Sequence, residues 1–226
     1  MKVTKRLAIV PARIGSKRIK QKNIKKIGSK ALIEYTLDTL KKSKLFDTIH
    51  VSTDSEKIKK LIKRNKLDFN FMRPKNLSGD KVPISSVIRF VLKSFKKLNK
   101  AFDEVWLVYA SNPFISAHHL RNAYKLYTSN KSKYSIMSVS NYNYPIKWAL
   151  SLDKKNKLKP INPKIKNIDN NEVCEAVLFV IYQKNFLKKK LIYKGYKIPI
   201  WDTVDIDTID DFIMAKKLLK QSYEHL

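Results

Sequence analysis

Basic side chains are concentrated in one short loop near the start of the chain. The loop follows an apolar run at 7–10 and reads PARIGSKRIKQKN from Pro11 to Asn23; its cations are Arg13, Lys17, Arg18, Lys20 and Lys22. Gly15 and Ser16 are small enough for backbone N–H groups to approach an anion, and arginine and lysine head groups hold phosphate oxygens. The spacing fits neither the P-loop nor the dinucleotide-binding fingerprint. The loop therefore predicts a phosphate site of another kind, with a solvated basic loop as the alternative.

Carboxylates are scarce in this chain, yet five aspartates fall within the segment WDTVDIDTIDD at 201–211. In an extended segment Asp205 and Asp207 lie on the same side, where they can share a hard cation such as Mg²⁺. Asp210 and Asp211 have a structural explanation, because Thr208 and Asp211 are spaced as a helix cap and acidic side chains favour a helix N-terminus. The segment predicts a magnesium site followed by a capped helix; the alternative is a helix-entry feature alone.

Other side chains with chemical potential receive structural interpretations. His118 and His119 begin an expected helix, where capping or surface exposure accounts for them. We expect the single cysteine, Cys174, to be inert. Tyr109 stands at the end of the most apolar strand, where it either lines a pocket or belongs to the core.

Composition limits the class of protein. The 226 residues carry a formal net charge of +29, from 48 Lys and Arg against 19 Asp and Glu. Such a field attracts polyanions, but the lysines are scattered over expected outer helix faces, so we expect no nucleic-acid partner. One cysteine excludes a disulfide framework and a cysteine-based zinc site. No apolar run reaches the roughly 18 residues of a membrane span, and no signal-peptide pattern opens the chain; we expect a cytoplasmic protein with no membrane partner.

Strand and helix patterns alternate along the chain. We expect strands at 7–10, 48–52, 69–72, 104–109, 134–140, 176–182 and 197–200, and helices at 31–42, 55–64, 83–98, 118–128 and 209–223. Thr53 and Glu56 are spaced as a capping box for the second helix. The alternation predicts an α/β fold with a mostly parallel central sheet, helices on both faces and ligands at the carboxyl ends of the strands.

The chain shows no internal repeat and no linker, so we expect a single domain over residues 1–226. Periodicity fades from Asn141 to Asn171, within an excursion at about 141–175. A segment of this length is either a long functional loop or an arm that packs on a partner.

Four motifs occur in an order typical of one enzyme family. They are PARIGSKRIKQKN at 11–23, RPKNLSGD at 73–80, YASNPF at 109–114 and DIDTIDDF at 205–212. On these residues, nearly the whole chain resembles the CMP-acylneuraminate synthetases, cytidylyltransferases that activate nonulosonic (sialic-type) acids. YASNPF and the later YPIKWAL, at 144–150, are most similar to the pseudaminic acid cytidylyltransferases of that family.

The resemblance implies a Rossmann-like nucleotide-diphospho-sugar transferase fold and a homodimer formed through a dimerisation arm. It also implies Mg²⁺-dependent transfer of CMP from CTP to the anomeric hydroxyl of a sugar acid, with release of pyrophosphate. By motif match, the catalytic residues would be Arg13 and Lys22. The nucleotide would be held by Ala12, Arg13, Ser16, Lys22, Asn23, Arg73, Ser78 and Asp80. Tyr109 would face the sugar, and the Mg²⁺ ligands would be Asp205 and Asp207.

The chain departs from the family pattern at two places. Ile14 replaces a usual glycine, although Gly15 remains. Pseudaminic-type members carry Tyr-His-Asp-x-Gly-Gln-Phe where this chain reads VCEAVLF at 173–179, so polar groups have become Cys174, Val177 and Leu178. Because a site that hydrogen-bonds hydroxyls discriminates by leaving groups unpaired, this change predicts a different sugar or a more weakly held one.

The basic residue that the family places to meet the sugar carboxylate is loosely matched by Lys164 or Lys166. Two alternatives to the family function stay open. One is a transferase for another sugar acid or nucleotide, and the other is a non-catalytic protein that binds nucleotide or nucleic acid.

Overall fold

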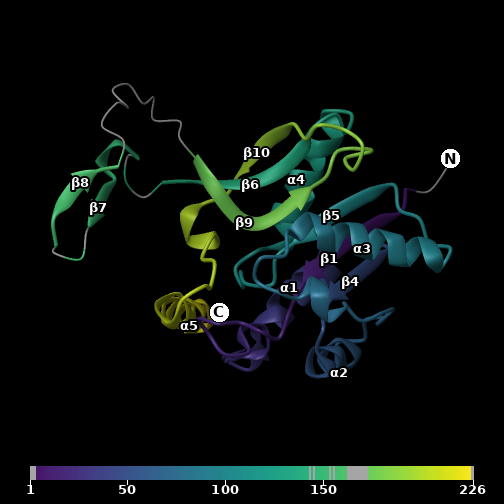
Figure 1. The fold of residues 1–226 in the computed structure, drawn as a ribbon, viewed down its shortest axis with the longest axis horizontal. Coiled ribbons are helices and arrows are strands. Elements are labelled where there is room, and N and C mark those ends of the chain that lie inside the picture. The colour runs from purple at the N-terminus through teal and green to yellow at the C-terminus, as the bar shows by residue number, and fades with distance from the viewer. Residues whose placement is uncertain are drawn as a thin grey trace.

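A six-stranded sheet forms the centre of the molecule, in the order β10-β6-β9-β5-β1-β4 (Figure 1). The computed structural model describes residues 4–142, 144, 146–152, 154, 156–161 and 173–224. The strands are β1 (Arg6–Pro11), β4 (Thr48–Ser52), β5 (Glu104–Val108), β6 (Ser135–Asn141), β9 (Val173–Ile181) and β10 (Tyr193–Lys197). β9 runs antiparallel to both of its neighbours, and every other pairing is parallel. The predicted mostly parallel sheet is confirmed.

Helices cover both faces of this sheet because its central strands are apolar on both sides. One face packs against α1 (Leu32–Ser43), α2 (Glu56–Arg64) and α4 (Ala117–Ser129), around the buried Trp106. The other face packs against α3 (Ile84–Lys97), whose Ile88, Val91 and Phe95 meet Leu7 and Ile9 of β1. Strands buried on both faces are typical of parallel sheets.

A third apolar cluster lies beside the carboxyl ends of the strands. There Phe212 and Ala215 of α5 (Ile209–Glu224) pack against Ile206 and Val204 and against Ile19 and Leu32 from the other end of the chain. This packing brings the acidic segment at 205–207 next to the basic loop after β1, although the two are far apart in the sequence.

The remaining elements are short. They are β2 (Lys26–Ile27) paired with β3 (Lys30–Ala31), β7 (Leu150–Leu152) paired with β8 (Leu158–Pro160), and the 3-10 turns η1 (Lys22–Ile24), η2 (Lys75–Leu77), η3 (Ile146–Trp148) and η4 (Ile200–Asp202). The β7–β8 hairpin stands away from the sheet at the left of Figure 1. Among the described residues, no helix is long and apolar enough to cross a membrane.

A bulge interrupts the pairing of β6 with β9. Met137 pairs with Val180, but Val139 pairs with Glu175, so β9 carries extra residues between these two points. The buried Ser138 holds the bulge: its hydroxyl oxygen accepts hydrogen bonds from the backbone N–H groups of Leu178 and Phe179, each at 3.1 Å. Val177, within the bulge, has a φ of 50°. A β-branched residue rarely adopts this left-handed conformation.

Three local predictions are wrong. Residues 69–72 form no strand, because Phe69 and Phe71 pack into different apolar clusters and leave the backbone without a ladder beside β4. α2 is capped by Ser55, whose hydroxyl accepts from the Ile58 N–H, rather than by Thr53. The last strand is Tyr193–Lys197 instead of 197–200.

Candidate active site

A cavity of about 610 Å³ opens where the carboxyl ends of β1 and β5 meet the segments after β4 and before α5. This is the edge at which ligands bind in sheets of this kind. The predicted residues that line it are Arg13, Ser16, Lys22, Asn23, Arg73, Asp80, Tyr109, Asp205 and Asp207. Two others lie outside the lining: the buried Ala12 donates its backbone N–H to Ser52 O, and Ser78 accepts from Arg13 through its backbone oxygen.

The loop after β1 is fixed from both sides. The Ile14 N–H donates to the Asp54 carboxylate at 3.1 Å, and Asn23 Nδ2 donates to Arg13 O at 2.9 Å. A Cβ added to Gly15 would meet no atom within 4 Å, so the backbone of the loop is open at this point. The loop therefore presents its cations from a defined backbone.

Two carboxylates hold the four cations of this loop that line the cavity. Asp80 pairs with Arg13 at 2.5 Å and with Lys17 at 2.7 Å. The hydrogen bond from Lys17, with that from Arg13, holds the pKa of Asp80 below its usual range. Because carboxylate oxygens occupy the guanidinium and ammonium groups here, the same groups can hold phosphate oxygens of a ligand.

Asp207 makes the second set of ion pairs, with Lys22 at 2.8 Å and Arg18 at 2.7 Å. Lys22 Nζ also donates to the backbone oxygen of Ile206. Partial burial acts to raise the pKa of Asp207, but the hydrogen bond and charge of Lys22, with the charge of Arg18, outweigh it and lower the pKa. Asp207 is therefore an anion whose charge is balanced by the cations Lys22 and Arg18.

Arg73 contributes a buried positive charge to the same cavity. Only 6% of this residue is exposed, and its Nε and Nη2 find no hydrogen-bond partner in the described part of the chain. Burial lowers the pKa of its guanidinium, with the charge of Asp54 acting in the opposite direction. Since a buried unpaired donor is costly, this guanidinium is suited to a ligand oxygen.

Asp205 lies in a different environment from Asp207. Its Oδ1 accepts a short hydrogen bond from Ser111 Oγ, and the backbone of the same serine accepts from the Ile206 N–H at 3.0 Å. Burial raises the pKa of Asp205, against the hydrogen bond from Ser111 and the charge of Lys22. Sequence reasoning missed Ser111, although its place just after β5 and next to Tyr109 is a signal that a search of strand ends could have used.

The expected helix cap is present at the start of α5. Asp211 accepts from the Thr208 N–H at 2.7 Å, and the Asp211 N–H donates to Thr208 Oγ1 at 3.2 Å. Asp211 also accepts from the Asp207 N–H, which ties the cap to the acidic segment. At α4, His119 Nδ1 accepts from the N–H of the capping Ser116, which agrees with the capping interpretation of that histidine.

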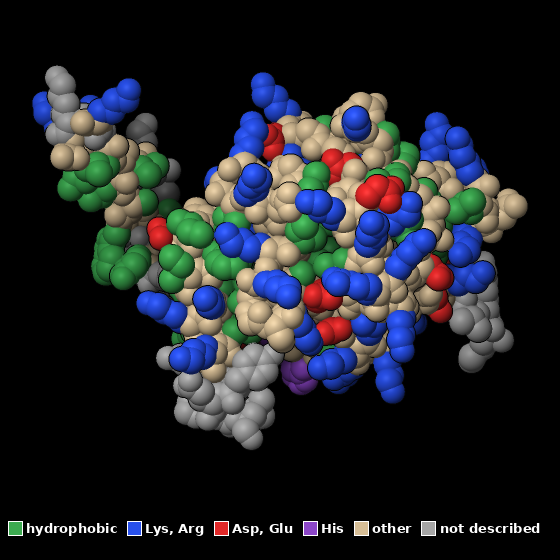
Figure 2. All heavy atoms as spheres, turned by 90° about the horizontal axis from the view of Figure 1, so that it is seen from below, with side chains coloured by type: hydrophobic (Ala, Val, Ile, Leu, Met, Phe, Trp, Pro, Cys, Tyr) green, Lys and Arg blue, Asp and Glu red, His purple; other side chains and the backbone are tan. Residues whose placement is uncertain are grey.

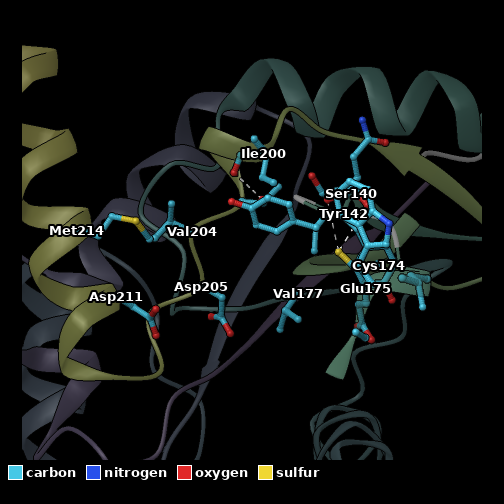
Figure 3. A pocket seen from close by; sticks show the side chains of 17 residues that line it. Ser140, Tyr142, Cys174, Glu175, Val177, Ile200, Val204, Asp205, Asp211 and Met214 are labelled. Carbon is cyan, nitrogen blue, oxygen red and sulfur yellow. Dashed lines mark hydrogen bonds between the residues drawn. The ribbon is translucent and has the colours of Figure 1, made fainter. Parts of the chain in front are cut away.

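A second cavity, of about 720 Å³, lies beside the first and shares Val177 and Asp205 with it. Figure 3 shows these two side chains next to each other, with Cys174 and Glu175 of β9 on one side and Val204 and Met214 on the other. Leu178 lines neither cavity and is fully buried in the core. Tyr109 lines the first cavity, and burial, with the nearby Glu175 and Asp205, raises its pKa to about 12.

The carboxylate pair Asp205 and Asp207 lines the first cavity and could hold a metal ion. No group of three or more His, Cys, Asp or Glu side chains with metal-binding geometry occurs in the described ranges. Mg²⁺ usually takes one or two carboxylates and completes its shell with water and substrate phosphates. Two hard carboxylates on the wall of one cavity fit that requirement. Lys164 and Lys166 lie outside the described residues.

The family model described as "Cytidylyltransferase" matches residues 7–200. This range includes the basic loop at 11–23, Arg73, the segment after β5 with Tyr109 and Ser111, and the β6–β9 bulge. The chain belongs to this cytidylyltransferase family. The resemblance inferred from the four motifs is thereby confirmed.

Relatives of the cytidylyltransferase match it along nearly its whole length. It is 30% identical to the pseudaminic acid cytidylyltransferase of Campylobacter jejuni subsp. jejuni serotype O:2, over 97% of this chain and 98% of that protein. It is 27% identical to the CMP-N,N'-diacetyllegionaminic acid synthase of Legionella pneumophila subsp. pneumophila, over 97% of this chain and 98% of that one. A solved CMP:2-keto-3-deoxy-manno-octonic acid synthetase in complex with CTP shares the fold, with a TM-score of 0.73 and 13% identity over 97% of this chain and 100% of that one.

Proposed function

We propose that this cytidylyltransferase transfers CMP from CTP to the anomeric hydroxyl of a nonulosonic acid of the sialic or pseudaminic type. The hydroxyl oxygen attacks the α-phosphorus, the bond from that phosphorus to the β-phosphate oxygen breaks, pyrophosphate leaves, and the hydroxyl proton passes to solvent. The observation that carries the proposal is one cavity in which the basic loop, the buried Arg73 and the Asp205–Asp207 pair converge.

The residues of the first cavity would act mainly by charge and position. Phosphoryl and nucleotidyl transfers need little covalent help from the protein, and donors fixed around the developing charge accelerate them. Arg13 would exchange its ion pair with Asp80 for the triphosphate, and Lys22 would do the same with its ion pair to Asp207. Lys22 would then neutralise the negative charge that grows on the leaving pyrophosphate. Arg73 would offer its unpaired guanidinium to the nucleotide, near Asp80 and the backbone of Ser78.

Asp205 and Asp207 would hold Mg²⁺ together with the triphosphate. When bound, this ion supplies charge neutralisation at the reacting phosphates. Departure of Lys22 and Arg18 toward the phosphates would free the oxygens of Asp207 for that role. The second cavity, joined to the first at Asp205, would receive the sugar acid, and Tyr109 would stand at the side of the reacting centre.

A homodimer is the second part of the proposal. An isolated two-stranded ribbon is marginally stable in water, yet Leu150, Leu152 and Leu158 of the β7–β8 hairpin are at least half exposed. Figure 2 shows this apolar arm projecting from the body. Exposed apolar patches of this kind mark interaction sites, and a second copy would cover the arm. The mass in solution at micromolar concentration, measured by light scattering, tests it: a monomer would contradict the dimer.

Lys and Arg side chains are spread over the face in Figure 2 without gathering into one stripe. This distribution supports CTP, rather than nucleic acid, as the anionic partner. Because CTP is a cytoplasmic metabolite, we place the reaction in the cytoplasm.

The proposal is tested by pyrophosphate release with four nucleoside triphosphates and a panel of sugar acids. We expect release only when CTP, Mg²⁺ and a nonulosonic acid are all present. The control is Lys20→Ala, which changes an exposed cation of the same loop outside the cavity. Equal release without any sugar acid, or with no preference for CTP, would contradict the proposed function.

A further inference from the structure

The two cavities meet at a strained residue. Val177 lines both of them, and it has a φ of 50° inside the β6–β9 bulge. We propose that Val177 determines acceptor specificity: its isopropyl group makes an apolar wall at the junction and favours acceptors that present methyl or methylene groups there over acceptors that present hydroxyls. This inference rests on the proposed function and names the acceptor class within it.

The conformation of Val177 is imposed by its surroundings. Leu178 and Phe179, directly after it, donate their backbone N–H groups to Ser138 Oγ, and the Leu178 oxygen accepts from the Tyr109 N–H at 2.9 Å. Non-glycine residues in the left-handed region persist only where neighbouring contacts hold them, and they gather at functional sites. Here those contacts come from β6 and from the end of β5, so the valine side chain is fixed beside Asp205.

The β9 residues next to Val177 in the second cavity are Cys174, Glu175 and Ala176, and of these Glu175 alone carries a charged group that can accept from a hydroxyl. Cys174 Sγ already lies 3.5 Å from Ser140 O, and Ala176 adds only a methyl group. On the opposite side of the cavity, Val204 and Met214 are apolar (Figure 3). A hydroxyl that is desolvated against the isopropyl group of Val177 loses hydrogen bonds to water and gains none from that side chain. Discrimination by an apolar wall is modest, of the order of 10- to 100-fold for one hydroxyl.

The experiment uses Val177→Asn in the full chain. Asparagine tolerates the left-handed conformation and carries an amide that can hydrogen-bond a hydroxyl. The readout is the ratio of kcat/KM for pseudaminic acid to kcat/KM for N-acetylneuraminate, the more hydroxylated acceptor. We expect wild type to prefer pseudaminic acid and the variant to lower that ratio at least roughly fivefold, with the KM for CTP unchanged.

Lys66→Asn is the matched control, because Lys66 has a φ of 56°, is exposed and lines neither cavity. Both variants should melt at a higher temperature than wild type, but only Val177→Asn should change the ratio. If the asparagine variant does not fold, Val177→Gly, which also relieves the backbone strain, replaces it. We expect this variant to lower the same kcat/KM ratio.

An unchanged ratio in a folded Val177 variant of an active enzyme overturns the inference and leaves the proposed function standing. Absence of turnover by wild type with every acceptor contradicts the proposed function itself, and the inference falls with it.

Discussion

Lys22 Nζ lies 2.8 Å from Asp207 Oδ1, while Asp205, two residues earlier, has a serine hydroxyl as its hydrogen-bond donor. The two carboxylates therefore differ in the ligand-free protein. Asp207 is stabilised as an anion by cations, and its pKa is lowered; burial dominates at Asp205 and raises its pKa.

This difference predicts opposite stability effects for two substitutions that should both abolish Mg²⁺-dependent turnover. Asp205→Asn keeps an acceptor for Ser111 and removes a poorly solvated charge, so the melting temperature should stay the same or rise. Asp207→Asn leaves Lys22 without a carboxylate, and its side chain is only 14% exposed, so stability should fall by about 1 kcal/mol.

A Mg²⁺ titration of pyrophosphate release and a thermal melt for each variant measure both effects. Asp210→Asn is the control, since Asp210 is exposed and lines neither cavity. Normal turnover with an unchanged Mg²⁺ midpoint in both variants would leave the pair as a feature of helix entry only.

Ser111 is predicted to position Asp205. Ser111→Ala removes the donor to Asp205 Oδ1 and frees that carboxylate to rotate. We expect a higher Mg²⁺ concentration at half-maximal turnover and a several-fold lower kcat, while the KM for CTP changes little. Ser111→Thr keeps a hydroxyl and should restore the midpoint. If the alanine variant alters only the melting temperature, the hydrogen bond is structural.

Arg13 is predicted to act in turnover more than in folding. It is part-exposed at the cavity and pairs with Asp80, an exposed carboxylate, so its loss should change the melting temperature little. Arg13→Ala should lower kcat at least about 100-fold, the loss expected for a donor that meets transition-state charge. Comparison with Lys20→Ala separates this effect from a general loss of positive charge. Equal activity of the two variants would make the loop a solvated surface.

His50 is predicted to make stability depend on pH. Its ring packs against Phe71 and Phe95, and burial lowers its pKa to about 3. At pH values between about 3 and the ordinary pKa near 6.5, His50 is protonated in the unfolded chain but neutral in the folded protein. The free energy of unfolding therefore falls as the pH is lowered through this range. The loss from pH 6.5 to 5 should be about 2 kcal/mol.

His50→Phe should remove that loss, as denaturant unfolding at the two pH values would measure. The lowered pKa of His119 acts in the same direction in both proteins and cancels in the comparison. The carboxylates with lowered pKa values lose their contributions only at lower pH; they are Asp38, Asp80, Asp207 and Asp211. An identical pH dependence of variant and wild type would contradict the prediction.

Much of the site could be predicted because its parts are local sequence patterns. The loop at 11–23 and the carboxylates at 205 and 207 are each visible in the sequence, and the rule for parallel sheets places the loop at the edge where ligands bind. Individual partners could not be predicted. The pairing of Lys22 with Asp207 depends on how α5 packs, and the orphaned donors of Arg73 depend on burial that no local pattern reports.

The wrong strand at 69–72 and the unpredicted bulge at Val177 share a cause. Apolar spacing indicates that Phe69 and Phe71 are buried, but it does not say whether the backbone between them finds a strand to pair with. Likewise, the apolar run at 176–182 predicts a strand, which is present as β9, but the bulge and the φ of Val177 come from the pairing of β9 with β6. The single-domain organisation over residues 1–226 stays a prediction.

The antiparallel strand β9 has a consequence for the order of folding. On the ribosome, β4, β1 and β5 can assemble from the first 108 residues, but one edge of β5 has no neighbour until β9 is synthesised. β6 is also made earlier than both of its partners, β9 and β10. Unpaired strand edges invite association between chains. The nascent protein therefore passes through a vulnerable interval between residues 141 and 173, which closes when a single late strand joins the two halves of the sheet.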